Sequence, residues 1–143
     1  MNISKDVYKR LENDDFAGVL TGSGGSIIYD TLNGGGHDHY IAVMYLLEFA
    51  MDGHSAAASK GFEEVVLNCT AHGDLYNVSR LLVCYAVLSE GESSYKELDV
   101  NWSRVSSAVR DSYYNHGHKF DGDVSVLLSL IDIERLFCRH NQQ

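Results

Sequence analysis

Two His-x-His triplets are the residues whose types and spacing first suggest chemistry. His37-Asp38-His39 and His116-Gly117-His118 each lie beside glycines and carboxylates. Imidazole and carboxylate groups are ligands for zinc or iron, and the triplets together with Asp38 or Asp121 contain enough donors for a four-ligand site. The chain has neither an HExxH nor a CxxC motif, however, and known zinc helices carry their histidines four residues apart. We therefore expect loop histidines near helix ends, with no metal and no cofactor.

A second pattern joins an arginine to a histidine in the stretch Arg110-Asp111-Ser112-Tyr113-Tyr114-Asn115-His116. It resembles the active-site motif of the HEPN ribonucleases, which are small and all-helical. The resemblance implies that Arg110 holds phosphate charge and that His116 acts as the base, across a dimer interface. Arg135 and His140 nearly repeat the pattern, and a ribonuclease needs a cationic groove, whereas this chain has a net charge of −9. A HEPN-like ribonuclease is therefore the alternative hypothesis, and we expect that the chain is not an enzyme.

The elements that must position these residues are helices. Apolar residues recur with a period near 3.6 between glycines and polar clusters, and the chain contains no proline. We predict an all-α fold, with residues 1–143 forming one domain built as a bundle of seven or eight short helices. Helices are expected over residues 3–11, from 16, over 26–32, 38–51, 55–72, 74–89 and 101–114, and from 123.

The most apolar of these helices is expected over residues 38–51, where Glu48 is the only charge after Asp38. A helix that is apolar almost all round belongs in the middle of the fold. Glu48 is therefore expected to lie out of water and to make an internal hydrogen bond. Further along the chain, Gly73 suits a helix end and Asp74 suits the N-cap of the next helix.

Residues 70–82, with the sequence Thr-Ala-His-Gly-Asp-Leu-Tyr-Asn-Val-Ser-Arg-Leu-Leu, resemble the turn and second helix of an ankyrin repeat. Residues 56–73 show a fainter similarity. The glycines at positions 36, 61 and 73 are 25 and 12 residues apart, so the 33-residue period of ankyrin arrays is missing. We expect one ankyrin-like helical hairpin and no array.

The cysteines and the amino terminus bear on the compartment. Cys69, Cys84 and Cys138 are an odd number, lie far apart and fall in apolar helical patterns, which is typical of reduced thiols. The first residues contain no apolar run suited to a signal peptide, and no stretch reaches the ~18 apolar residues that a membrane span needs. We therefore predict a cytoplasmic protein.

The charge of the chain is one-sided over most of its length. Residues 11–99 contain fourteen acidic residues against Lys60, Arg80 and Lys96, whereas residues 100–143 contain five of each sign. A negative field of this kind repels nucleic acid and anionic membranes and attracts basic surfaces. The sequence therefore predicts a basic protein partner, without direct binding of nucleic acid or membrane, and leaves the oligomeric state open.

The candidate partner-binding residues are acids at expected helix starts and loops, together with aromatic residues among them that can act as anchors. Trp102, Tyr113 and Tyr114 are further aromatic candidates. The predicted set is Asp14, Asp15, Asp30, Asp38, Asp52, Glu63, Glu64, Tyr76, Glu90, Glu92, Tyr95, Glu97 and Asp99.

A small, helical, acidic chain without catalytic motifs resembles bacterial immunity proteins, especially those that neutralise cationic nuclease toxins of contact-dependent growth inhibition and related delivery systems. The resemblance is one of overall character and is carried by residues 11–99. It implies an inhibitor that covers the basic active-site cleft of a toxin, with carboxylates in place of the phosphates of the substrate. It also implies that the inhibitor has no catalytic residues of its own.

Overall fold

The computed structural model describes residues 5–21, 38–90 and 95–116, apart from the side chains of Asp38, Glu90 and His116. Every regular element in this part of the chain is a helix, which confirms the all-α class for these residues. The expected helices over 26–32 and from 123 lie outside the described residues, so the total of seven or eight stays a prediction. The elements are α1 (Lys5–Glu12), α2 (Phe16–Leu20), α4 (Asp38–Phe49), the π-helical turn η1 (Ala50–His54), α5 (Ser55–Ala71), α6 (Leu75–Glu90) and α7 (Trp102–His116).

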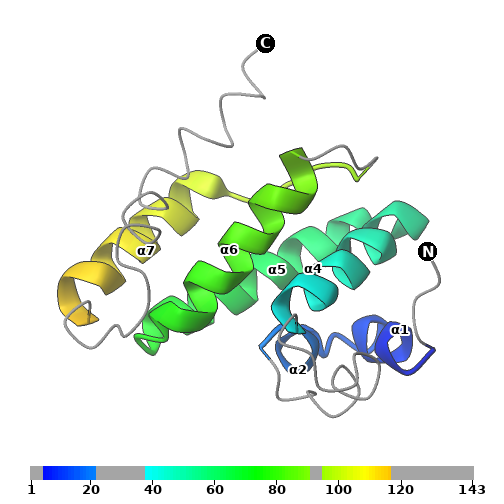
Figure 1. Cartoon of the computed structure of the whole chain (residues 1–143), viewed down its shortest axis with the longest axis horizontal. Coiled ribbons are helices and arrows are strands. Elements are labelled where there is room, and N and C mark those ends of the chain that lie inside the picture. The colour runs from blue at the N-terminus through cyan, green and yellow to red at the C-terminus, as the bar shows by residue number, and fades with distance from the viewer. Residues whose placement is uncertain (1–4, 22–37, 91–94, 117–143) are drawn as a thin grey trace.

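The helices alternate between two layers along the chain, as can be followed in Figure 1. In the first layer, α4 packs against α1 and against α6. In the second layer, α5 packs against α2 and against α7. Stacking helix pairs in this way is the packing principle of helical-repeat proteins, in which each pair buries its apolar face against its neighbours. The apolar helix α4 contacts α1, α2, α5 and α6 and so lies among the described helices on several sides, as its sequence predicts.

Side-chain contacts show that α4 and α6 run parallel. His39, at the start of α4, bonds to Asn77 at the start of α6, with 2.7 Å between His39 Nε2 and Asn77 Oδ1. Near the end of α4, Glu48 Oε1 accepts a hydrogen bond of 2.9 Å from the hydroxyl of Tyr95, which follows α6. One end of the molecule therefore contains the ends of both helices.

In the second layer α5 and α7 also run parallel. Before α7 begins, the backbone N–H of Asp99 donates to Ser59 Oγ near the start of α5 at 2.9 Å. Near the end of α7, the hydroxyl of Ser112 donates to the carbonyl oxygen of Thr70 at 2.9 Å. The starts of α5 and α7 therefore lie at the same end of the molecule as η1 and the end of α6, along the upper side of the view in Figure 1.

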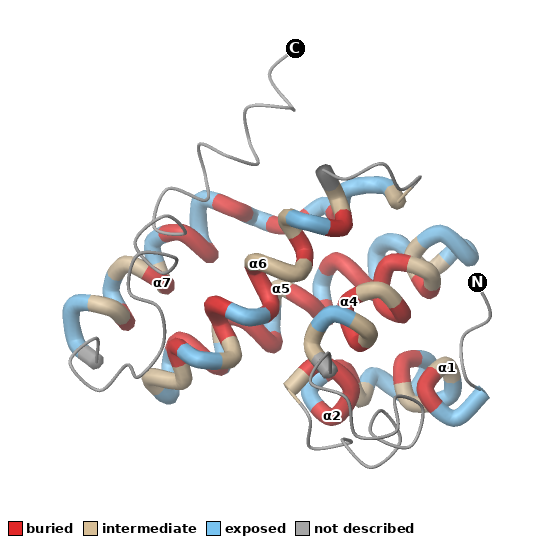
Figure 2. The backbone as a smooth tube through the Cα atoms, viewed as in Figure 1, coloured by how far each residue is buried: buried red, intermediate tan, exposed pale blue. Residues whose placement is uncertain are grey.

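The core lies between the layers, where the buried residues face one another in Figure 2. Its aromatic centre is formed by Phe62, Tyr85 and Trp102, with ring centroids 5.3 Å apart for Phe62 and Tyr85 and 5.2 Å apart for Tyr85 and Trp102. The hydroxyl of Tyr85 accepts the backbone N–H of Leu98 at 2.7 Å. Trp102 is only 3% exposed, so it belongs to the core, as its helical spacing predicts, and it is not available as a surface anchor.

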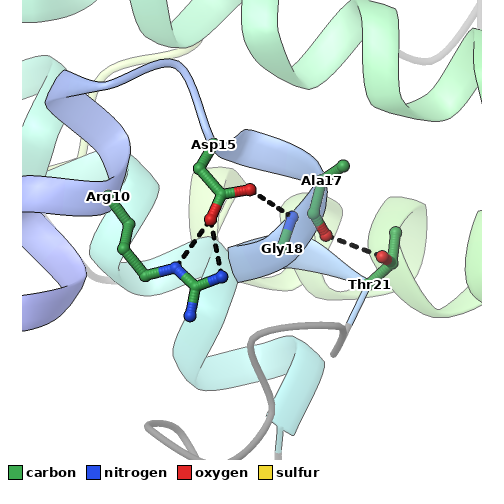
Figure 3. A network of polar contacts seen from close by, with 5 residues as sticks. All are labelled: Arg10, Asp15, Ala17, Gly18 and Thr21. Atoms are coloured by element: carbon green, nitrogen blue, oxygen red, sulfur yellow. Dashed lines mark hydrogen bonds and ion pairs between the residues drawn. The ribbon is translucent and has the colours of Figure 1, made fainter.

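The α1–α2 corner is built by polar contacts, shown in Figure 3. Asp15 caps α2 by accepting the backbone N–H of Gly18 at 3.2 Å, and its carboxylate pairs with Arg10 at 2.6 Å. Thr21 closes the other end of this helix, because its hydroxyl donates to the carbonyl oxygen of Ala17 at 2.6 Å. The corner is therefore held together by hydrogen bonds and an ion pair within its own residues.

Two of the predicted helix starts are confirmed by side-chain caps. Asp74 accepts the backbone N–H of Asn77 at 3.2 Å, and Asn101 accepts that of Arg104 at 3.1 Å. Between α5 and α6 the chain turns at Gly73, whose φ of 70° is costly for any residue with a Cβ. The hairpin predicted in this region is thus present, and its likeness to an ankyrin repeat stays a prediction.

The helix expected over 38–51 is present. Ala50 and Met51 continue the helical geometry of α4 into η1, and the chain leaves it at Asp52 (φ −85°, ψ 21°) and Gly53 (φ 99°). Gly53 allows the reversal into α5 because a side chain at this φ would be strained.

Candidate partner-binding surface

Exposed carboxylates gather at the end of the molecule where α4 ends and α7 begins. Asp52 lies in η1, and Glu97 and Asp99 lie in the segment between α6 and α7; the side chains of all three are exposed. We call these three residues the acidic end. They belong to elements far apart in sequence, so the fold brings them to the same end of the helices.

The segment between α6 and α7 is held on the helices by acceptors that the helices supply. Residues 95–100 belong to no helix or strand, so their backbone N–H groups need hydrogen-bond acceptors from elsewhere in the chain. Besides the bonds of Leu98 and Asp99 described above, the backbone N–H of Asn101 donates to Glu63 Oε1 at 2.7 Å. With the backbone turned inward, the carboxylates of Glu97 and Asp99 stay in solvent.

Tyr95 at the start of this segment is fixed by Glu48. Its hydroxyl donates to Glu48 at 2.9 Å, which confirms the prediction that Glu48 makes an internal hydrogen bond, although Glu48 is half-buried rather than fully buried. Burial and then this bond to a carboxylate raise the pKa of Tyr95 to about 12. The predicted anchor Tyr95 is therefore half-buried, with its hydroxyl committed to α4.

Asp52 is oriented by a tyrosine from α1. The hydroxyl of Tyr8 donates to Asp52 Oδ2 at 2.6 Å, and this bond is the main reason that the pKa of Tyr8 is raised to about 12. His54 Nε2 lies 3.1 Å from the same hydroxyl, and the ring of His54 stacks on Phe49 with centroids 4.2 Å apart. Because the Tyr8 proton is used on Asp52, the contact with His54 requires an N–H on Nε2 that donates to the tyrosine oxygen. Asp52 is thus a positioned, exposed carboxylate.

The other described candidates divide into exposed and occupied residues. Asp14 is exposed at the α1–α2 corner with φ 62°, and Glu64 is exposed on α5, 4.0 Å from Lys60. Asp15 and Glu63 are half-buried and already serve the fold, as the cap of α2 and as the acceptor at the start of α7. Of the remaining candidates, Asp30 and Glu92 lie outside the described residues, as do the side chains of Asp38 and Glu90.

Tyr76 is the most clearly exposed of the predicted aromatic anchors outside α7. Its side chain on α6 is 51% exposed, with Arg80 placed 5.3 Å from the ring centroid and the ring of His39 packed edge-on at 6.1 Å. Tyr113 is half-buried and Tyr114 is 74% exposed, both on α7.

Sequence reasoning missed three exposed apolar residues. Tyr40 is 36% exposed, Met51 46% and Val87 56%, and all belong to α4, η1 or α6. The signal was present, because a helix with apolar residues almost all round, as in 38–51, must leave some of them uncovered unless it is enclosed on every side.

The catalytic alternatives gain little from the geometry. Arg110 is half-buried on α7, and the side chain of His116 lies outside the described residues. Six positions along one helix separate their directions by about 120°, so the pair does not share a helix face. Cys69 is buried, and desolvation raises its pKa to about 11, opposite to what a nucleophilic thiol needs.

Across residues 5–21, 38–90 and 95–116, His, Cys, Asp and Glu form no group of three or more that could hold a metal ion. Within the same ranges no helix combines the length and apolar character needed to cross a bilayer.

Comparison with known proteins gives no relative from which a function can be carried over. No family model, no curated protein and no solved structure matches the chain.

Proposed function

We propose that this chain is an immunity protein that binds and neutralises a basic toxin domain through its acidic end. The toxin domain that we propose is a nuclease. In this proposal the chain acts in the cytoplasm as a stoichiometric inhibitor and carries no catalytic residues. The carboxylates occupy the positions that phosphates of a nucleic-acid substrate take in the cleft of the toxin.

The observation that carries the proposal is the exposure of Asp52, Glu97 and Asp99 at one end of the helices, where Lys96 is an exposed cation beside Glu97. Lys60 lies 4.0 Å from Glu64, and Arg104 Nη1 lies 3.6 Å from Glu63 Oε2. These cations are therefore matched with carboxylates that do not belong to the acidic end. Asp52, Glu97 and Asp99 remain exposed, and they are part of the acidic excess that gives the chain its net charge of −9.

Such a field acts chiefly on the rate of association. A focused potential of one sign raises the on-rate for a partner of opposite charge by about 10 to 10³, and salt screens the effect. Fast association benefits an inhibitor that protects a cell from a nuclease, because free toxin cleaves nucleic acid until it is bound.

The test compares two charge reversals of equal size. Asp99→Lys changes the acidic end, and Asp111→Lys changes an exposed acid in the second half of α7, toward the other end of the molecule. The proposal predicts that the gene immediately upstream encodes a secreted protein with a basic carboxy-terminal domain, and that domain is the binding probe, measured by stopped-flow association from 20 to 500 mM salt. We expect Asp99→Lys to slow association about 3- to 10-fold at low salt and Asp111→Lys to change it less than twofold.

Equal effects of the two reversals would mean that only net charge matters and that the acidic end is not the binding site. If the upstream gene encodes no basic carboxy-terminal domain, or if that domain does not bind the wild-type chain, the immunity function is wrong.

A further inference from the structure

We propose that the peptide unit between Asp52 and Gly53 is a site of spontaneous modification, at which Asp52 isomerises to isoaspartate at a rate that Tyr8 restrains. The reaction needs neither a partner nor a cofactor, so this proposal is independent of the function proposed above. It is carried by the residue that follows Asp52, by the exposure of η1 and by the hydrogen bond on the Asp52 carboxyl group.

The chemistry takes place between two neighbouring residues. The backbone nitrogen of Gly53 attacks Cγ of Asp52 in its protonated carboxyl form. A nitrogen–carbon bond forms, and the nitrogen proton and the carboxyl hydroxyl leave as one water molecule. Water then opens the five-membered succinimide ring: opening at Cγ restores aspartate, and opening at the former main-chain carbonyl gives isoaspartate. One water is released and one is taken up, so the atoms balance without an oxidant or a reductant.

Glycine makes this position the most reactive of its kind in the part of the chain that the structure describes. There, Asp52 is the one aspartate or asparagine that a glycine follows. A side chain on the following residue would shield the attacking nitrogen and restrict the backbone, and glycine does neither. A Cβ built on Gly53 would meet nothing within 4 Å, so the space beside this residue is open. The pairs Asn33-Gly34 and Asp121-Gly122 lie outside the described residues.

The turn η1 is well suited to the local opening that ring closure requires. It contains no buried residue, whereas every described α-helix contributes residues to the core. Asp52 and Gly53 are both exposed, and both lie outside helical geometry. Segments with few buried apolar contacts open at a low cost in free energy. The Gly53 nitrogen and Asp52 Cγ can therefore approach one another while α4 and α5 stay folded.

The hydroxyl of Tyr8 opposes this approach. It donates to Asp52 Oδ2 at 2.6 Å, and turning the carboxyl group toward the backbone nitrogen breaks this bond. Tyr8 is itself held, because its ring packs edge-on against the buried Phe49 with centroids 5.2 Å apart and its oxygen lies 3.1 Å from His54 Nε2. Hydrogen bonds to a charged group are among the stronger ones in proteins. Tyr8 therefore slows the reaction without preventing it.

Isomerisation changes the turn between α4 and α5. Isoaspartate adds one carbon to the main chain, and its carboxylate lies one carbon closer to the chain than that of aspartate. The bond from Tyr8 to the carboxylate of Asp52 is therefore lost. Because Asp52 belongs to the acidic end, this surface changes as the protein ages, whatever binds there.

The experiment follows the full-length chain at pH 7.4 and 37 °C over several weeks. Samples are digested with a protease that cleaves before aspartate but not before isoaspartate, and the peptides are quantified by mass spectrometry. We expect cleavage before Asp52 to decline with time, while cleavage before Asp6 and Asp99 stays complete. These two are exposed aspartates followed by valine, so they are controls within the same molecule.

Three variants test the parts of the proposal. Gly53→Asn adds a side chain but keeps a residue that tolerates positive φ, and it should slow the loss of cleavage before Asp52 about 5-fold or more. Tyr8→Phe removes the hydroxyl and should speed this loss about 3- to 10-fold. Tyr95→Phe is the matched control, because it removes a tyrosine hydroxyl that donates to another carboxylate, that of Glu48. It should change the rate by less than about twofold, and an equal gain in this control would attribute the effect to general destabilisation.

The outcomes are separable without any binding partner. The same chain kept unfolded in urea is the positive control and should lose cleavage before Asp52 fastest. Complete cleavage before Asp52 in both the folded wild type and Tyr8→Phe would overturn the proposal. Equal losses at Asp52, Asp6 and Asp99 would also overturn it, because exposure and not the following glycine would then set the rate. A wild-type rate in Tyr8→Phe would show that Tyr8 exerts no restraint.

Discussion

At the residue scale, acidic residues that are neighbours in the sequence differ in their contacts. Asp14 and Asp15 are adjacent in sequence and looked equivalent as members of an acidic corner. In the structure Asp14 is exposed at a positive φ, whereas Asp15 caps α2 and pairs with Arg10. Composition reveals that carboxylates are present, and only the fold shows which of them are already used.

This difference predicts unequal effects on stability. Asp15→Ala removes the cap and the pairing with Arg10 and should lower the free energy of unfolding by about 1 to 2 kcal/mol. Asp14→Asn removes a charge but keeps a residue that tolerates positive φ, so it should change stability by less than about 0.5 kcal/mol. Urea unfolding of both variants provides the measurement, and equal losses would contradict the assignment of Asp15 as the cap.

A second prediction at this scale concerns alkaline pH. Tyr95 has a pKa of about 12 in the folded chain, whereas a tyrosine in the unfolded chain has a pKa near 10. Because the folded value is raised, the stability that Tyr95 contributes is complete below about pH 10 and is lost as the pH rises toward 12. We expect the urea midpoint to fall over this window, and to fall less steeply in Tyr95→Phe.

The matched control for the alkaline loss is Tyr114→Phe, which alters a tyrosine that is 74% exposed on α7. It should follow the wild-type profile. An identical profile for Tyr95→Phe would show that the bond to Glu48 contributes nothing to the pH dependence.

At the element scale, the packing of α2 on α5 depends on the absence of one side chain. A Cβ built on Gly61 would lie 2.5 Å from the ring of Phe16, which is closer than real Cβ contacts allow. Phe16 is buried at the start of α2, so its ring has little room to move. The two helices approach one another at this glycine.

Gly61→Ala should therefore destabilise the protein, although replacing glycine by alanine inside a helix usually stabilises it. In the interior of an ordinary helix this substitution gains up to about 1 kcal/mol of helix propensity. Here overpacking against Phe16 should outweigh that gain and lower the free energy of unfolding by about 1 to 3 kcal/mol. A double-mutant cycle with Phe16→Leu measures the coupling; additive effects would mean that the clash is not with this ring.

Helical elements were predictable because their signals are local. Apolar periodicity located the helices within the described residues, and the caps Asp74 and Asn101 marked two starts. The break between α4 and α5 was predictable too, because the apolar pattern stops after Met51 and the chain leaves helical geometry at Asp52 and Gly53. The layered order depends on contacts between helices, which no local pattern encodes.

At the scale of the whole molecule, charge predicted a kind of partner but not a surface. The excess of acids over residues 11–99 is visible in the sequence, and the candidates derived from it include occupied residues such as Asp15 and Glu63. The acidic end forms because parallel helices bring Asp52 and Asp99 to one end. The exposure of Tyr76 was predicted, whereas Tyr40 and Val87 look like ordinary core residues in a helical pattern.

The alternating layers also bear on how the chain reaches its native state. In the described order α1, α2, α4, α5, α6 and α7, the main contacts of each helix are with the next helix or the next but one. Each pair can therefore pack on the preceding one as synthesis proceeds, without waiting for a distant segment to emerge from the ribosome. Prompt maturation of the nascent chain therefore follows from the order of its helices.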